Sequence, residues 1–128
     1  MVFSNPATIH KPLSTYSHQV EVSGSAKWLV MSGQVGMDKN GNIPENVIEQ
    51  LEIALDNIIS NLEAAGMSRE NLVKLTFYFV GPLDTAQRRG AVSAKMGGHE
   101  PCMTTMYVSG LANDAYKVEV DALACSEG

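Results

Sequence analysis

The sequence predicts a single α+β domain, residues 1–128, in which two helices pack on one face of a mixed β-sheet. Three observations predict this fold class. One long segment has apolar residues at helical spacing, several shorter segments have the alternation or the β-branched composition of strands, and the predicted elements follow one another in the order ββαβαββ. A single core in a chain of this length buries about two thirds of the unfolded surface.

The N-terminal quarter is expected to form an arm followed by a hairpin. Residues 1–15 are polar and contain two prolines, which predicts an irregular arm. Residues 17–33 indicate a hairpin, because Gly24-Ser25 is a pair that suits a two-residue type II′ turn. The second strand of this hairpin is apolar from Trp28 to Met31, so we expect it to be buried on both sides.

Two segments predict helices. Residues 46–65 carry apolar side chains every three or four positions, with Pro44 suited to the first turn and Gly66 to the C-terminal cap. A second helix is expected over residues 85–96, with Asp84 as its N-cap.

Three further segments predict strands. Residues 72–80 are rich in β-branched and aromatic side chains, and residues 102–109 and 115–124 alternate. In the last of these, the apolar face holds Tyr116, Val118, Val120 and Ala122, and the polar face holds Lys117, Glu119 and Asp121.

The predicted elements leave one face of the sheet uncovered. Two helices cover one face, whereas strands 26–32 and 72–80 look apolar on both faces. An uncovered apolar face needs a partner, and the simplest partner is another copy of the same chain. The sequence therefore predicts self-association.

The composition narrows the class of protein. The net charge is −5 and no basic stripe is present, which argues against nucleic-acid binding. No run of about 18 apolar residues predicts a membrane span, and no secretion signal is expected at the N-terminus. The two cysteines, Cys102 and Cys125, do not make a disulfide framework, so we expect reduced thiols in a cytoplasmic protein.

Few residues form a pattern that could support catalysis. The three histidines do not have metal-ligand spacing, so no metal is expected, and Cys102 is more typical of a small buried hydrophobe than of a nucleophile. Glu119 and Asp121 lie two residues apart on one strand face, an arrangement that could orient and deprotonate a water molecule. The same pair is equally consistent with a solvated face or an ion pair with Lys117.

Several stretches, taken together and in order, resemble the RidA/YjgF family over about Tyr16 to Ala124. They are similar to the family's Tyr-Ser-Gln segment, its Ser-Gly-Gln strand end, its Val-Lys-x-x-x-Phe strand and its Ile-Glu-Ile-Glu-Ala ending. The stretches are TYSHQVEVSG (15–24), LVMSGQVGMD (29–38), EAAG (63–66), NLVKLTFYFV (71–80) and KVEVDALA (117–124).

The resemblance implies a chorismate-mutase-like fold, a homotrimer, and sites in clefts between subunits. It also implies hydrolysis of reactive enamines and imines, such as 2-aminoacrylate, to 2-keto acids and ammonia, with no metal or organic cofactor. Carried onto this chain, the residue that orients the water is Glu119, presented by a neighbouring subunit. The residues implied to bind the substrate are Tyr16, Ser32, Gly33, Met103, Thr104 and Thr105.

One departure from the family pattern bears directly on substrate binding. Pro101 matches the family's Pro-Ala-Arg-Ser motif and Thr104 replaces its serine, but Met103 stands where the arginine would hold the substrate carboxylate. A charge-assisted hydrogen bond of that kind contributes about 1.5–3 kcal/mol, and a thioether supplies none of it. We therefore expect standard 2-imino acid deamination to be weak or absent.

Three functions remain open at this point. The first is binding or hydrolysis of a small, less anionic metabolite in an intersubunit cleft. The second is weak enamine or imine deamination with another cation, such as Arg88, Arg89 or Lys117, in place of the missing arginine. The third is a non-catalytic regulatory or RNA-associated role, against which the acidic composition counts.

Overall fold

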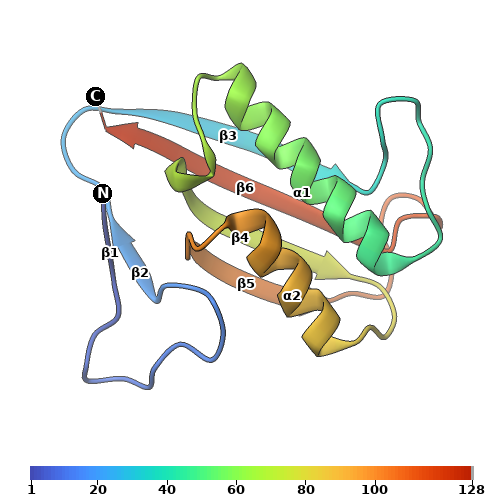
Figure 1. Cartoon of the computed structure of the whole chain (residues 1–128), viewed down its shortest axis with the longest axis horizontal. Helices are drawn as coiled ribbons and strands as arrows, with labels where there is room; N and C mark the ends of the chain where they lie inside the picture. The colour runs from blue at the N-terminus through green and yellow to red at the C-terminus, as the bar shows by residue number, and fades with distance from the viewer. Residues whose placement is uncertain (128) are drawn as a thin grey trace.

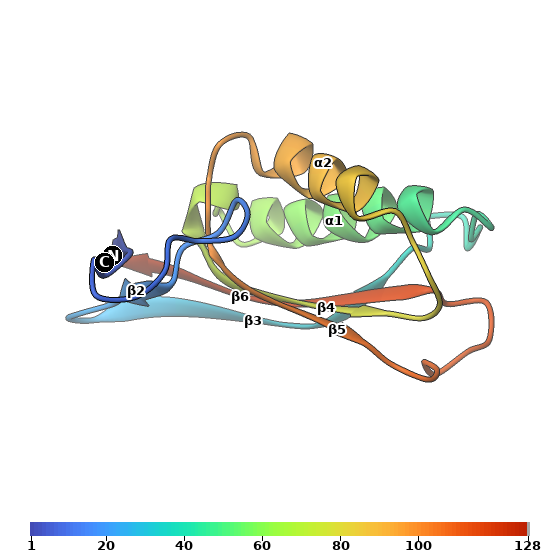
Figure 2. The same ribbon diagram turned by 90° about the horizontal axis from the view of Figure 1, so that it is seen from below.

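The computed structural model describes residues 1–127 and consists of a four-stranded sheet with both helices packed on one of its faces (Figure 1, Figure 2). The elements, in chain order, are β1 (Val2–Ser4), β2 (Gln19–Glu21), β3 (Ala26–Val35), α1 (Val47–Ala64), a 3₁₀ turn (Arg69–Asn71), β4 (Leu72–Phe79), α2 (Thr85–Met96), β5 (Cys102–Tyr107) and β6 (Val118–Glu127).

The four-stranded sheet is mixed and has the strand order β3-β6-β4-β5. Strand β6 pairs antiparallel with both β3 and β4, whereas β4 and β5 are parallel and are joined by the crossover helix α2. The predicted fold class, a mixed sheet with two helices on one face, is confirmed. The strands β1 and β2 form a separate two-stranded antiparallel sheet.

Both helices begin and end at sequence signals. Asn46 caps α1 by accepting hydrogen bonds from the backbone amides of Ile48 and Glu49, and Gly66 (φ 72°) closes its C-terminus. Asp84 caps α2 by accepting from the amide of Gln87, as predicted. No helix within residues 1–127 combines the length and the apolar character needed to cross a bilayer.

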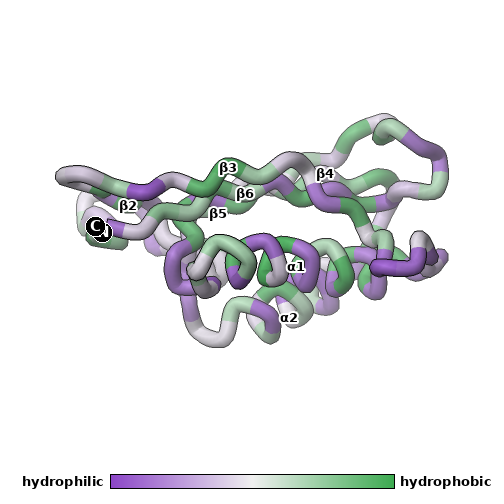
Figure 3. The backbone as a smooth tube through the Cα atoms, turned by 90° about the horizontal axis from the view of Figure 1, so that it is seen from above, coloured by the Kyte–Doolittle hydropathy of each residue, from purple (hydrophilic) through white to green (hydrophobic). Residues whose placement is uncertain are grey.

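The core lies between the helices and one face of the sheet. Hydrophobic and hydrophilic residues alternate along β4 and β6 (Figure 3), so that each strand presents its apolar side to the helices. The buried side chains on this face include Leu75, Phe77, Phe79, Val118, Val120 and Ala122, which pack against Leu51, Leu55, Ile58 and Leu62 of α1.

The opposite face of the sheet, hereafter the open face, carries no helix among residues 1–127. The prediction that strand 72–80 is apolar on both faces is wrong, because Lys74, Thr76 and Tyr78 occupy its open side. The prediction that Trp28 to Met31 is buried on both sides is also wrong within one chain. Met31 is buried, but Val30 is 73% exposed, so this strand has an uncovered apolar side.

The predicted hairpin over residues 17–33 does not form. Strand β2 pairs with β1 instead, which also corrects the expectation that residues 1–15 are irregular. The reason is a long-range anchor: the amide of Ser17 donates to the carbonyl of Pro101, and its hydroxyl donates to the carbonyl of Glu100. This anchor holds the chain beside the start of β5, at the edge of the sheet opposite to β3.

The last strand begins later than predicted, at Val118 rather than at residue 115. Gln50, a buried side chain of α1, donates to the carbonyl of Ala115 and accepts from the amide of Lys117. These backbone groups are therefore satisfied by a side chain rather than by a neighbouring strand. Tyr116 and Lys117 consequently lie in the loop before β6 and not on its faces.

Candidate functional site

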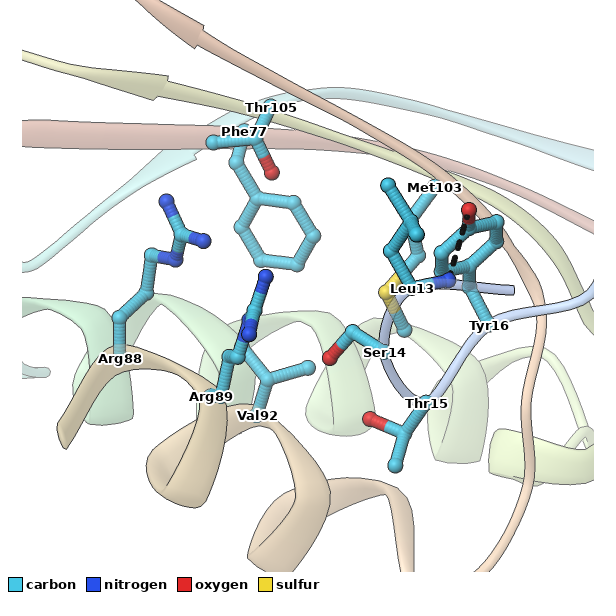
Figure 4. A pocket seen from close by; sticks show the side chains of 10 residues that line it. All are labelled: Leu13, Ser14, Thr15, Tyr16, Phe77, Arg88, Arg89, Val92, Met103 and Thr105. Atoms are coloured by element: carbon cyan, nitrogen blue, oxygen red, sulfur yellow. Dashed lines mark hydrogen bonds between the residues drawn. The ribbon is translucent and has the colours of Figure 1, made fainter. Parts of the chain in front are cut away.

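A cleft of about 270 Å³ lies between the N-terminal arm, helix α2 and the edge strand β5 (Figure 4). Three elements that are distant in sequence form its walls. The residues that line it are Leu13, Ser14, Thr15 and Tyr16 of the arm, Phe77 of β4, Arg88, Arg89 and Val92 of α2, and Met103 and Thr105 of β5.

The sheet register places two of the predicted substrate-binding residues in this cleft. In the parallel ladder Met103 lies beside Leu75 and Thr105 lies beside Phe77, so both side chains stand on the helix-covered face. Since β5 is an edge strand, these side chains are only partly covered by the core and are accessible from the side.

The arm is fixed against the cleft by its own hydrogen bonds. The hydroxyl of Tyr16 accepts from the amide of Leu13 at 3.1 Å, and this contact closes a short loop. The hydroxyls of Thr15 and Ser93 are 3.0 Å apart and join the arm to α2 across 78 residues of sequence. Together with the Ser17 anchor, these contacts make residues 13–16 a formed wall of the cleft.

The charged residues of the cleft are both arginines. A guanidinium nitrogen of Arg88 donates to the hydroxyl of Tyr107 at 3.0 Å. Arg89 has no hydrogen-bonded or ionic partner among residues 1–127. None of the described residues that line the cleft is an aspartate or a glutamate, and Lys117 does not line it. The cleft is therefore cationic, in a chain that is acidic as a whole.

Glu119 lies outside this cleft, on the open face of β6. It is next to Gly33, where β3 has a bulge, because the register of β3 against β6 shifts between Met31 and Gln34. A side chain built at Gly33 would collide with the Glu119 carboxylate, with its Cβ 2.6 Å from Glu119 Cδ. The glycine therefore gives the Glu119 side chain the space in which it lies. Ser32, the other bulge residue, is exposed.

Other polar groups lie on the same open face as Glu119. The Tyr78 hydroxyl donates to Asp121 Oδ2 at 2.9 Å. This hydrogen bond, together with lost hydration and the nearby carboxylates, raises the pKa of the Tyr78 hydroxyl above its ordinary value. Lys74 donates to the Thr104 hydroxyl at 2.7 Å, which places Thr104 on the open face and not in the cleft.

Cys102 also belongs to the open face, at the start of β5 beside Lys74. Burial raises the pKa of its thiol, and the charge of Lys74 opposes this effect only in part. A thiol with a raised pKa is a poor nucleophile at neutral pH, in agreement with the sequence interpretation. Among residues 1–127 no cluster of three or more His, Cys, Asp or Glu side chains could hold a metal ion.

The predicted site residues thus fall into two groups within one chain. Tyr16, Met103 and Thr105 line the cleft. Gly33 and Glu119 lie together on the open face, with Ser32 at the bulge of β3, and Thr104 lies on the same face but two strands away from β6.

The sequence interpretation missed several members of the cleft. It did not include the arm residues Leu13, Ser14 and Thr15, nor Phe77 and Val92. No local pattern in the sequence could have indicated that the arm crosses to α2 and β5. The alternation of strand 72–80 could have placed Phe77 on the same face as the cleft, because it contacts position 105 through the sheet register.

Comparisons with known proteins agree on one family. The family model described as endoribonuclease L-PSP matches residues 7–126. The chain is 31% identical over 119 residues, 91% of each protein, to a RutC family protein of Pyrococcus horikoshii. It is 29% identical over 114 residues to the mouse protein named 2-iminobutanoate/2-iminopropanoate deaminase, covering 88% of this chain and 82% of that one.

A similar solved structure is that of a Rid family protein of unknown function, YyfB from Yersinia pestis. The two chains superpose with a TM-score of 0.88 at 27% sequence identity, over 98% of each. The likeness therefore covers the sheet, both helices and the N-terminal arm.

Proposed function

Because this chain belongs to the RidA/YjgF family, which the endoribonuclease L-PSP model describes, we propose that it binds or hydrolyses a small reactive metabolite with an enamine-type or imine-type carbon–nitrogen bond. The observation that supports this proposal most directly is the cleft beside Met103. Its volume of about 270 Å³ suits a small molecule and not a polymer. Relatives at similar identity are named imine deaminases.

Such a reaction needs few catalytic groups from the protein. An imine carbon is already electrophilic, so hydrolysis needs a held substrate and a correctly placed water molecule. A carboxylate can orient and deprotonate that water. We assign this role to Glu119, and we assign substrate contacts to Tyr16, Met103 and Thr105 in the cleft and to Ser32, Gly33 and Thr104 on the open face. No metal or organic cofactor takes part in the proposed reaction.

The proposal requires a second subunit, because Glu119 and the cleft lie on opposite faces of one sheet. Glu119 of one chain can serve the cleft of another if the open face of the first packs beside strand β5 of the second. Such packing would also cover Trp28, which is 50% exposed, and Val30. We propose that the assembly is the homotrimer of the family, with one cleft completed at each subunit boundary.

The assembly can be tested without any substrate. Sedimentation equilibrium at micromolar concentration is expected to give three times the 13.8 kDa mass of one chain. A mass of 13.8 kDa would exclude the shared site.

A cytoplasmic location is consistent with the proposal, because Cys102 and Cys125 are both free thiols.

The expected substrate is not a standard 2-imino acid. Met103 leaves the strand wall of the cleft without the positive charge that would hold and align a carboxylate next to the reacting carbon. We therefore propose weak or absent deamination of 2-aminoacrylate and 2-iminobutanoate, and hydrolysis or binding of imines whose substituents differ.

The test is a hydrolysis assay on freshly generated imines, with ammonia and carbonyl product both measured. The panel would contain 2-iminobutanoate together with imines that lack a carboxylate beside the reacting carbon. We expect at least one imine to be hydrolysed faster than in buffer, and we expect Glu119→Gln, which removes the ionised carboxylate at nearly constant volume, to abolish that acceleration. Equal rates for the wild type and Glu119→Gln across the panel would refute the proposed role of Glu119.

A further inference from the structure

The α2 wall of the cleft carries two positive charges that nothing in the described chain neutralises. Arg88 and Arg89 line the cleft, and neither forms an ion pair with any of residues 1–127. The protein has 14 acidic residues against 9 lysines and arginines, yet none of the acidic residues in the described chain lines this cleft. The local charge is thus opposite in sign to the charge of the whole protein, as is typical of an anion-binding site.

The two arginines have different surroundings. Arg88 is partly covered and its guanidinium is held by the Tyr107 hydroxyl at 3.0 Å. Arg89 is exposed, and its donors have no partner among residues 1–127. Figure 4 shows both side chains extending from α2 toward the sheet, with the Ser14 hydroxyl directed into the same space. Arg89 therefore has its fork of donors available for a ligand, and Arg88 is already oriented beside it.

The wall across from α2 is apolar. Leu13 and Met103 lie on the far side of the cleft from the two guanidinium groups, and the ring of Phe77 lies between them (Figure 4). A ligand that fits both walls has an oxyanion at one end and a short hydrocarbon segment at the other.

We propose that Arg88 and Arg89 form the anion-binding wall of this cleft. The ligand is a small organic carboxylate whose charged group lies against α2 and whose apolar end lies against Met103. This inference rests on the proposed function, because it concerns the same cleft. It adds that the carboxylate is held on the helix wall and not at strand position 103, so the ligand lies with its charge away from Met103.

We expect Arg89 to contribute more to the binding free energy than Arg88. A guanidinium can bind both oxygens of a carboxylate at once, and such bonds to charged groups are stronger than those between neutral groups. Arg88 contributes charge and one further donor, because part of its hydrogen-bonding capacity is used by Tyr107.

Ligand binding can be measured by NMR titration of the isotope-labelled full chain with butanoate and with butanamide. The two probes have nearly the same shape but differ in charge. We expect butanoate to shift the signals of Val92, Met103 and Thr105, and butanamide to bind about tenfold more weakly. Arg89→Gln is expected to weaken butanoate binding by about tenfold and to leave butanamide binding unchanged, whereas Arg88→Gln has a smaller effect.

Lys39→Gln is the matched control, because it removes one positive charge from an exposed position outside the cleft. It is expected to bind butanoate like the wild type. Three results would overturn the proposal: no butanoate binding by the wild type, unchanged binding by the Arg88→Gln/Arg89→Gln double variant, or an equal loss in Lys39→Gln.

The titration needs no turnover, so it separates this inference from the proposed function. Arginine-dependent binding of butanoate without hydrolysis of any imine would leave the anion site intact and refute the hydrolytic role. The opposite result is that the Arg88→Gln/Arg89→Gln variant binds butanoate like the wild type and hydrolyses an imine at the same Glu119-dependent rate. That result would refute the anion site and leave the hydrolytic function intact.

Discussion

The two faces of the four-stranded sheet differ in polarity and in burial. The helix-covered face is hydrocarbon, with Leu75, Phe77 and Phe79 at most 2% exposed. The open face carries Glu119 and a tyrosine hydrogen-bonded to an aspartate, beside an exposed valine at position 30. Within residues 1–127, the sheet thus completes the core with one face and leaves the polar groups of the other face without a helix packed over them.

The same division separates the residues of the proposed site within one chain. The cleft opens at the β5 edge of the helix-covered face, whereas Glu119 lies on the open face. A strand alternates its side chains between faces, so neighbouring positions such as Met103 and Thr104 serve different environments.

The largest effect is expected for a change in the covered face. Leu75→Ala removes a fully buried side chain and is expected to lower the free energy of unfolding by about 2–5 kcal/mol. Thr76→Ala, the next residue on the open face, is expected to change it by less than about 0.5 kcal/mol. Urea unfolding at one fixed protein concentration measures both. Equal losses would show that the two faces do not differ in their contribution to stability.

A change in the cleft is expected to increase activity. Met103→Arg would restore a cation on the strand wall, worth about 1.5–3 kcal/mol of transition-state binding, and so raise hydrolysis of 2-iminobutanoate by about 10- to 150-fold. Adding Glu119→Gln should remove the gain. If Met103→Arg folds and assembles like the wild type but gains no activity, a missing cation at position 103 is not what limits the hydrolysis of imino acids.

Filling the space at Gly33, into which the Glu119 side chain extends, is expected to have an intermediate effect on stability. Gly33→Ala forces the Glu119 side chain aside and is expected to cost about 1 kcal/mol of stability. The double variant Gly33→Ala/Glu119→Ala should recover most of that loss, because the clash is gone. Gly90→Ala, with open space around its Cβ in α2, is the control and should stabilise the protein by up to about 1 kcal/mol. A double variant as unstable as Gly33→Ala alone would contradict the assigned contact.

The smallest effect concerns the hydrogen bond from Tyr78 to Asp121. The pKa of Tyr78 is raised in the folded state above its ordinary value of 10.0. The hydrogen bond therefore contributes fully to the free energy of unfolding below pH 10.0, and this contribution is lost as the pH rises through the raised pKa. Tyr78→Phe is expected to be less stable than the wild type by at most about 1 kcal/mol near neutral pH. The difference should shrink at alkaline pH, and a difference independent of pH would argue against the hydrogen bond.

Much of the fold could be predicted because its signals are local. Helices 46–65 and 85–96 were predicted within a residue or two of α1 and α2, since periodicity and the capping residue Asp84 act within a few positions. The prediction of a hairpin over residues 17–33 was wrong because Ser17 is hydrogen-bonded to Glu100, 83 residues later. No local pattern in the sequence indicates such a long-range contact.

The candidate site was predictable in part for the same reason. The resemblance indicated positions such as Met103 and Glu119, because each lies in a recognisable strand motif. The sheet register places these residues on two different faces, and a hydrogen bond between Thr15 and Ser93 of α2 places the arm residues at the cleft. Neither is encoded in any short stretch of sequence.

We propose that Glu119 of one subunit completes the cleft of another. Isotope-filtered NMR on an assembly mixed from labelled and unlabelled chains tests it directly, because only contacts between chains give signals. We expect nuclear Overhauser effects between the Met103 methyl group of one chain and the Glu119 side chain of its neighbour. An assembled protein without those signals, in which Met103 contacts only residues of its own chain, would contradict it.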